Sequence, residues 1–230
     1  MKRGPRPYKN TSTRWTQELA YAVGLIATDG CLSIDGRHID FTSKDKSLVV
    51  TFRKCLKLTN KIGRKTSGST GQKNYFHIAF GDVQFYQWLH ALGLTPHKSK
   101  TIEALRIPDQ YFFEFLRGCW DGDGSLYAYW DKRWHSSYMY YLTFSSASIL
   151  FLQWLHKTIT RLTGIKGSIK LSTKSHQLAF AKSASRVLFR KMFPSENIPF
   201  LKRKFIKARR IFKKDARHSL QARVEELVDS

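Results

Sequence analysis

Two aspartates at matching positions in the chain are the residues best suited to do chemistry. Asp29 and Asp123 each end an apolar stretch, each precedes a glycine, and they stand 94 residues apart. If the fold brings them together, two carboxylates on a basic protein offer hard oxygen ligands, which suit Mg²⁺ or Mn²⁺ better than zinc. Such a pair predicts metal-assisted chemistry on a phosphate.

The aspartates belong to an internal repeat. The segment Leu19–Leu32 matches Phe113–Leu126 at the same constant offset, so that Gly24 aligns with Gly118. Shorter hydrophobic and basic segments also recur downstream of each copy. Two copies of one unit predict a molecule made of two halves related by a pseudo-two-fold axis.

A helix is expected to carry each aspartate. Thr16 is suited to cap a helix over 17–28, and Pro108 opens the equivalent helix, which is expected to end near Trp120. Small residues allow these helices to pack side by side with a close backbone approach; they are Ala20, Gly24, Ala27 and Gly118. Both aspartates then meet at one end of the pair, where the negative helix terminus makes a nearby cation favourable.

Alternating and helical hydrophobic patterns follow each of these helices. They predict strands at 34–43, 75–80, 138–144, 168–171 and 177–181. They predict further helices at 46–58, 83–92, 148–162 and 183–192. The order predicts two mixed halves, each built on an antiparallel sheet.

The distribution of charge predicts an anionic partner. The chain has 40 Lys and Arg against 17 Asp and Glu, a formal charge of +23. Residues 46–81 and 132–195 contain no acid, which gives one strongly basic window to each half, as expected for two surfaces that lie against phosphates. No membrane partner is expected, because the longest uncharged stretch, 134–156, is rich in polar residues.

The two motifs resemble those of a known family. Ala22–Gly30 and Leu116–Gly124 are similar to the signature motifs of LAGLIDADG homing endonucleases of the single-chain, two-motif kind. The resemblance covers about residues 16 to 214. It implies an α+β fold of two αββαββα halves, with the signature helices at the central interface. The two four-stranded antiparallel sheets would form a saddle in the major groove of DNA.

The same resemblance implies an activity and a cofactor. The activity is cleavage of both DNA strands within a long, nearly asymmetric site, leaving short 3′ overhangs. The cofactor is Mg²⁺, with Mn²⁺ as a substitute and Ca²⁺ supporting binding without cleavage. The runner-up is a catalytically silent nucleic-acid-binding protein or an intron RNA maturase on the same fold.

Residue by residue, the resemblance makes Asp29 and Asp123 the metal ligands, assisted by the carbonyls of Thr28 and Gly122. The first motif departs from the family pattern. Its Ala27 stands where the second motif has an acid, and Thr28 replaces a glycine. Because the family's ligand is the final acid of each motif, activity is still expected, and the extra acid of the second motif, Asp121, is expected to be dispensable.

A basic residue near each scissile phosphate is also typical of the family. It matches Lys98 in the first half, with Lys100 as the alternative, and Lys204 in the second, with Lys202 as the alternative. A lysine there can stabilise transition-state charge or orient the attacking water.

Basic and polar residues in and beside the predicted strands are candidates for contact with DNA, since side chains along a strand alternate between its two faces. They are Arg37, Lys44, Arg64, Lys73, His77, Lys132, Arg133, Lys170, Lys174 and Lys182. Arginine or lysine can read guanine, and Gln72 or Gln177 can read adenine.

The predicted organisation is a basic N-terminal tail at 1–15, halves at 16–107 and 108–215, and a C-terminal tail at 216–230. Covalent duplication predicts a monomer, and the predicted partner is double-stranded DNA, with intron RNA as the alternative. No secretion signal is evident, and three cysteines without metal-ligand spacing indicate a reducing compartment. An intron-encoded protein in a bacterial or archaeal cytoplasm or an organelle is expected.

Overall fold

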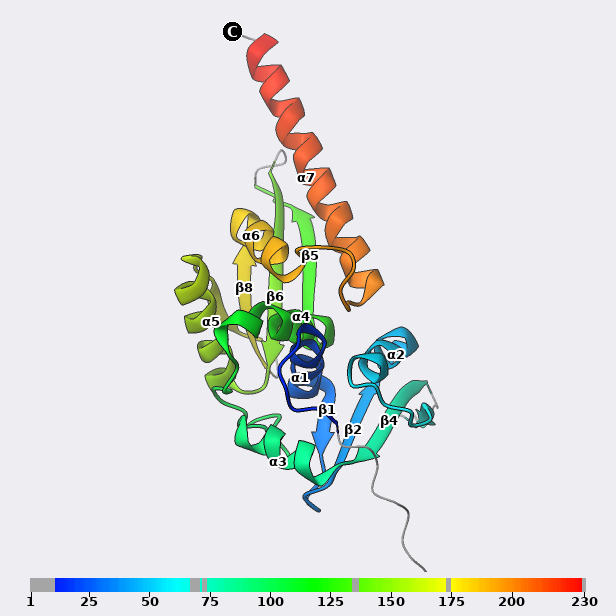
Figure 1. The fold of residues 1–230 in the computed structure, drawn as a ribbon. Helices are drawn as coiled ribbons and strands as arrows, with labels where there is room; N and C mark the ends of the chain where they lie inside the picture. The colour runs from blue at the N-terminus through cyan, green and yellow to red at the C-terminus, as the bar shows by residue number, and fades with distance from the viewer. Residues whose placement is uncertain (1–10, 67–70, 72–73, 134–136, 173–174, 229–230) are drawn as a thin grey trace, which may run out of the picture.

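The repeat is visible in the structure, a computed structural model that describes residues 11–66, 71, 74–133, 137–172 and 175–228 (Figure 1). The first half comprises α1 (Gln17–Asp29), β1 (Gly30–Leu32), β2 (His38–Ser43), α2 (Lys46–Cys55), β3 (Gly63–Lys65), β4 (Tyr75–Gly81) and α3 (Val83–Ala91). A 3₁₀ turn (Asp109–Tyr111) leads into the second half. That half comprises α4 (Phe112–Asp123), β5 (Gly124–Trp130), β6 (Tyr138–Ser146), α5 (Ile149–Thr163), β7 (Ser168–Leu171), β8 (His176–Ala181), α6 (Lys182–Met192) and α7 (Lys202–Val228).

Each half contains a four-stranded antiparallel sheet, and the strand order is the same in both. The orders are β1-β2-β4-β3 and β5-β6-β8-β7. The registers also correspond, since Gly30 pairs with Phe41 in the first sheet and Gly124 pairs with Phe144 in the second. The predicted α+β fold of two αββαββα halves is therefore confirmed.

The strands that the hydrophobic pattern did not predict are short or directly follow a helix, and the long helix α7 was not predicted either. β1 and β3 have three residues each, too few for alternation to show, and β5 continues from the last turn of α4. The strand predicted from residue 34 begins only at His38. Before it, Asp35 accepts hydrogen bonds from the backbone N–H groups of Arg37 and His38 (both 3.0 Å), which makes a turn.

The two signature helices pack against each other at the centre of the molecule, with a sheet on either side (Figure 1). Their contact brings backbone against backbone. A Cβ atom on Gly24 would lie 2.1 Å from the carbonyl oxygen of Phe115, and one on Gly118 would lie 2.2 Å from that of Tyr21. Only glycine fits at either position, which is why the repeat places Gly24 opposite Gly118.

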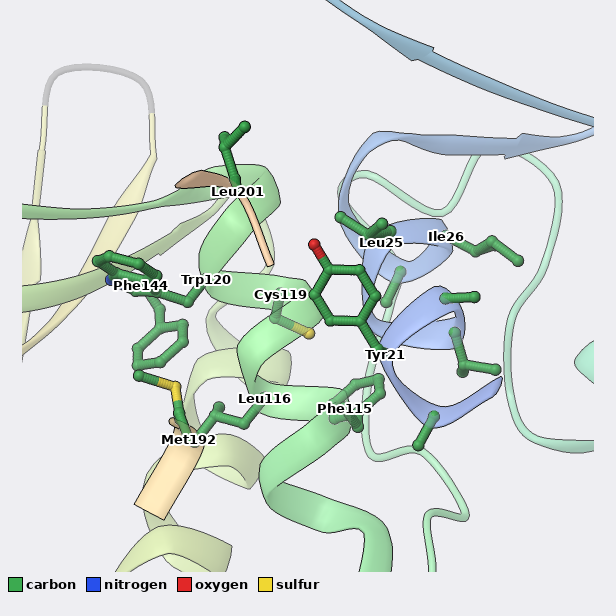
Figure 2. Close-up of a cluster of buried hydrophobic side chains, with 14 of the residues drawn as sticks. Tyr21, Leu25, Ile26, Phe115, Leu116, Cys119, Trp120, Phe144, Met192 and Leu201 are labelled. Carbon is green, nitrogen blue, oxygen red and sulfur yellow. The ribbon is translucent and has the colours of Figure 1, made fainter. Parts of the chain in front are cut away.

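A polar network crosses this interface on one side only. Tyr21 projects from α1 toward α4 (Figure 2), and its hydroxyl donates to Oδ2 of Asp121 (2.8 Å), which also accepts from the backbone N–H of Leu201 (2.7 Å). Burial raises the pKa of Asp121 to about 6. At the offset of the repeat, the counterparts of Tyr21 and Asp121 are Phe115 and Ala27, both buried and apolar.

A buried arginine extends the network. The guanidinium of Arg117 lies 5.4 Å from the centre of the Tyr21 ring and donates to the carbonyls of Met192 (2.6 Å) and Pro199 (3.0 Å). Arg117 is fully buried, and burial lowers its pKa. It thereby ties the connection between α6 and α7 to the central helices.

Replacing Tyr21 by Phe is expected to lower the free energy of unfolding by about 1–3 kcal/mol, since it removes a donor from a buried carboxylate. Urea denaturation would measure the loss. Tyr86→Phe is the matched control, because that hydroxyl donates to a neutral carbonyl, of Ser33 (2.6 Å). An equal or smaller loss for Tyr21→Phe than for the control would contradict this role.

The last helix is much longer than its neighbours and runs outward along the second half (Figure 1). Phe205, Ala208 and Ile211 bury one side of α7. Farther along, Asp215 accepts from Arg186 (2.7 Å) and from Tyr140 (3.1 Å). The predicted division at residue 216 falls inside α7. None of the helices in the described segments combines the length and apolar character needed to cross a bilayer.

Candidate active site

The two aspartates of the repeat lie together at one end of the central helix pair. Asp29 is the last residue of α1 and Asp123 the last residue of α4. A Cβ atom on Gly122 would lie 3.0 Å from Oδ2 of Asp29, so that carboxylate lies directly against the end of the opposite helix. Asp29 is half-buried, while Asp123 is exposed and open to a ligand from solvent.

The surroundings of the two carboxylates disfavour their ionised forms. Burial is the main cause that raises the pKa of Asp29, to about 7, and the charge of Asp123 raises it further. Desolvation by the surrounding protein also raises the pKa of Asp123, although part of this residue is exposed. A cation bound between them would remove this repulsion.

Lys204, in the first turn of α7, reaches the end of α4. Its Nζ lies within hydrogen-bond distance of the carbonyls of Trp120 (2.8 Å), Asp121 (2.8 Å), Gly122 (2.9 Å) and Gly124 (2.6 Å), which share its three N–H donors. These carbonyls lie at the negative end of the helix, where some have no partner within the helix itself. Burial lowers the pKa of Lys204 to about 8.

Lys98 occupies the corresponding place in the first half. It is buried, and its Nζ donates to the carbonyl of Gly30 at the end of α1. The charges of Lys98 and Lys204 lower the pKa values of both aspartates against the larger effect of burial. The alternatives, Lys100 and Lys202, are exposed. The structure thus brings Lys98 and Lys204 to the carboxylate pair.

The donor set fits a hard divalent cation. No group of three or more His, Cys, Asp or Glu side chains that could hold a metal occurs in the described part of the chain. A cation here would take the two carboxylates and complete its coordination with other oxygens, as Mg²⁺ commonly does. Of the two carbonyls predicted to assist, that of Gly122 already accepts from Lys204.

The solvent-facing side of the first sheet carries both acidic and basic side chains. Asp40 on β2 contacts Lys65 on β3 (3.0 Å) and His77 on β4 (3.4 Å). Lys44 follows β2 and lies over the ring of Tyr75 (5.3 Å). His77 and Lys44, both predicted to contact DNA, therefore belong to this side.

The other candidates in the first half are placed differently. Arg64 is paired in register with Phe76 and lies over that ring (5.5 Å), on the side of the sheet that the helices cover. Arg37 is exposed in the turn before β2. Lys73 and Gln72 lie outside the described residues. Sequence reasoning missed Lys65, whose face depends on the register of a three-residue strand.

In the second half, one of the predicted basic residues lies in a described strand, and it faces solvent. Lys170 is exposed on β7, opposite Gln177. Lys132 and Arg133 lie in the exposed connection after β5, where Arg133 pairs with Asp131 (3.3 Å). Lys182 begins α6, beyond the end of β8. Lys174 lies outside the described residues.

Comparison with known proteins identifies the fold. No family model matches the chain, and no curated protein matches it. The homing endonuclease I-WcaI bound to its DNA recognition sequence matches with a TM-score of 0.60 and 13% identity, over 89% of this chain and 95% of that one. I-DmoI in complex with DNA and Ca matches with a TM-score of 0.54 and 14% identity, over 84% and 97%. Full-length DUF199/WhiA from Thermatoga maritima matches with a TM-score of 0.55 and 15% identity, over 95% and 69%. The chain has the LAGLIDADG fold.

Proposed function

We propose that this protein is a site-specific homing endonuclease. It makes a metal-dependent double-strand break with short 3′ overhangs in a long, nearly asymmetric DNA target, and it acts as a monomer because both halves of the site lie in one chain. The observation that carries the proposal is the meeting of Asp29 and Asp123 at the end of the central helix pair, with Lys98 and Lys204 beside them. A protein that only bound DNA would have no use for two mutually repelling carboxylates at that point.

Asp29 and Asp123 would hold Mg²⁺ or Mn²⁺. When bound, such an ion polarises the scissile phosphate and makes water a better nucleophile. I-DmoI, which shares the fold, was solved in complex with DNA and Ca, and a variant of it was solved with target DNA in the presence of Mg. Divalent metal use in this chain is a proposal that rests on its own carboxylates.

The chain's remaining residues contribute position and charge. The two lysine ammonium groups lie near the carboxylates, where they offset negative charge that develops on the phosphate during cleavage. The two sheets would hold the DNA so that one strand approaches each aspartate. Because α1 and α4 fix both carboxylates to one rigid interface, the two cuts are held at a fixed spacing.

A binding-only role, with DNA or intron RNA, is the second candidate. Its support is the match to WhiA, which shows that proteins other than homing endonucleases share the fold. The fold alone therefore does not establish cleavage.

The test separates the two functions. Duplexes with a randomised core are selected for binding in Ca²⁺, and the recovered sequence is placed in a plasmid and incubated with Mg²⁺, Mn²⁺ or EDTA. A single double-strand cut in Mg²⁺ or Mn²⁺, absent in EDTA, is the expected result. Tight sequence-specific binding without a cut would overturn the nuclease proposal in favour of binding alone.

Replacing Lys204 by Met is expected to lower both stability and cleavage. Its four carbonyl partners would lose a charged donor, and we expect a loss in the free energy of unfolding of about 1–3 kcal/mol. Lys98→Met removes a donor from one carbonyl and should cost less. Thermal and urea unfolding, with cleavage rates on the selected site, would check both.

Equal stability losses in the two variants would contradict the capping role of Lys204. Unchanged cleavage in a folded Lys98→Met protein would contradict the electrostatic role of that lysine.

A further inference from the structure

Three tyrosines form a cluster on the solvent-facing side of the second sheet. Tyr127 and Tyr129 lie on β5 and Tyr141 on β6. Their ring centres lie 5.5–6.5 Å apart, with planes 11–24° from parallel, so the rings stack against one another. Tyr127 is 38% exposed and Tyr129 45% exposed. Exposed aromatic side chains that are held in place by mutual stacking are typical of a surface that binds another molecule.

The register places this tyrosine cluster on the outer face of the second sheet, the face that the proposed function turns to DNA. Tyr127 pairs directly with Tyr141, and the alternate residues Leu126 and Leu142 point into the core. Ser125 and Thr143 share the outer face closer to the carboxylates, where their hydroxyls lie 2.9 Å apart. The side chains on this face near the centre of the sheet are thus neutral; Ser125 is exposed and Thr143 is buried.

The first half carries different side chains at the same positions. Its register makes Ser33 and His38 the counterparts of Tyr127 and Tyr141, since the backbone N–H of Ser33 donates to the carbonyl of His38 (2.9 Å) one step beyond the paired strands. The repeat offset makes Asp35 the counterpart of Tyr129, and the side chain of Asp35 contacts that of His38. His38 therefore stands at the place of Tyr141, while Asp35 matches Tyr129 in sequence offset but lies in the turn before β2, where it contacts His38.

With DNA bound as proposed, side chains at this place would meet base edges or phosphates, and the chemistry of the cluster favours base edges. A tyrosine has no positive charge with which to attract a phosphate. Its hydroxyl donates or accepts a hydrogen bond, which suits an acceptor such as thymine O4. Its ring edge is apolar, which suits contact with the thymine methyl group.

We propose that Tyr127, Tyr129 and Tyr141 read base pairs of the second half-site through neutral contacts, while Asp35 and His38 serve the equivalent positions of the first half-site. This inference rests on the proposed binding of DNA in the saddle. It assigns discrimination between bases in the second half-site to residues without charge, and it is consistent with the asymmetry proposed for the target.

The positions that the cluster reads follow from the length of β5. Tyr127 and Tyr129 stand four and six residues beyond Asp123, which is about 13 and 20 Å along an extended strand. At about 3.4 Å per base pair, the cluster would lie over base pairs about four to six from the metal site.

The test begins with the same selection from randomised duplexes in Ca²⁺, carried out with the unaltered protein and with Tyr127→Ala and Tyr129→Ala. We expect each variant to lose base preference at about four to six base pairs from the centre of one half-site and to keep it elsewhere. Affinity for the selected site should fall by about 5- to 150-fold. The slope of log K against log salt should stay unchanged, because no phosphate contact is lost.

Lys170→Ala is the matched control on the same face. It should reduce the salt slope by about 0.9 and leave base preference unchanged, as expected for loss of one phosphate contact. Tyr127→Phe separates the hydroxyl from the ring and keeps the stacking, and thermal unfolding confirms that each variant is folded.

Tyrosine variants that keep the full base preference, or that reduce the salt slope as Lys170→Ala does, would overturn this inference while the proposed function stands. If the unaltered protein enriches no sequence, the proposed function itself fails.

Discussion

Replacing Asp29 or Asp123 by Asn is expected to lower double-strand cleavage by on the order of 1000-fold or more, comparable to the loss of a principal electrostatic group in other active sites. The amide keeps the shape of the side chain but removes the negative charge that holds a hard cation. Binding to DNA in Ca²⁺ should remain measurable, since the sheets that hold the DNA are untouched.

The same substitutions are expected to leave stability unchanged or raise it. Burial and the neighbouring charge raise the pKa of Asp29 to about 7, above its value in the unfolded chain, so the ionised carboxylate opposes folding as the pH rises through that range. Removing the charge removes this cost. Thermal unfolding at pH 8 in EDTA would check it.

Asp109→Asn is the matched control for cleavage, because Asp109 is an exposed aspartate that pairs with Arg161 (2.6 Å) away from the site. It should cleave at the unaltered rate. Full cleavage by Asp29→Asn or Asp123→Asn would contradict the assignment of the active site.

Replacing Gly24 or Gly118 by Ala is expected to destabilise the fold by about 3 kcal/mol, the upper end of the usual cost of overpacking. Alanine favours a helix over glycine by about 1 kcal/mol, which acts in the opposite direction. The steric contact outweighs this gain, so the net change in stability is a loss. The added Cβ would lie 2.1–2.2 Å from a backbone oxygen of the facing helix, and backbone cannot move aside as a side chain can.

Urea unfolding would measure this loss, with Gly164→Ala as the control. Gly164 ends α5 at a φ of +74°, with no neighbouring atom within 4 Å of an added Cβ, so alanine there should cost only about 1–2 kcal/mol of backbone strain. A Gly24→Ala protein as stable as the unaltered chain would show that the two central helices separate easily.

The sequence was sufficient to predict the parts of the molecule that the repeat records twice. The first signature helix, the meeting of Asp29 with Asp123 and the antiparallel halves follow from the sequence. The second signature helix begins at Phe112 and ends at Asp123, where a helix from Pro108 to about Trp120 was predicted. One aspartate before a glycine would be weak evidence, whereas two at a constant offset restrict the arrangement in space.

What the sequence did not predict depends on pairing between distant segments. The face of Arg64 or of Tyr127 is set by strand register, which local alternation cannot define for a three-residue strand or for a strand that continues from a helix. Lys204 was expected beside a phosphate, but its capping of four carbonyls required knowledge of where α7 begins relative to α4.

The one-sided network across the central interface has a consequence for recombining the two halves. A chimera of two second halves would place Asp121 opposite Phe115 in place of Tyr21, leaving a buried carboxylate without its hydroxyl donor. A chimera of two first halves would place Tyr21 opposite Ala27 and leave the hydroxyl without its acceptor. The interface is therefore more stable between one first half and one second half than between two identical halves. Exchange of one half for a foreign one should succeed only when Tyr21 and Asp121, or an apolar pair in their place, are transferred together.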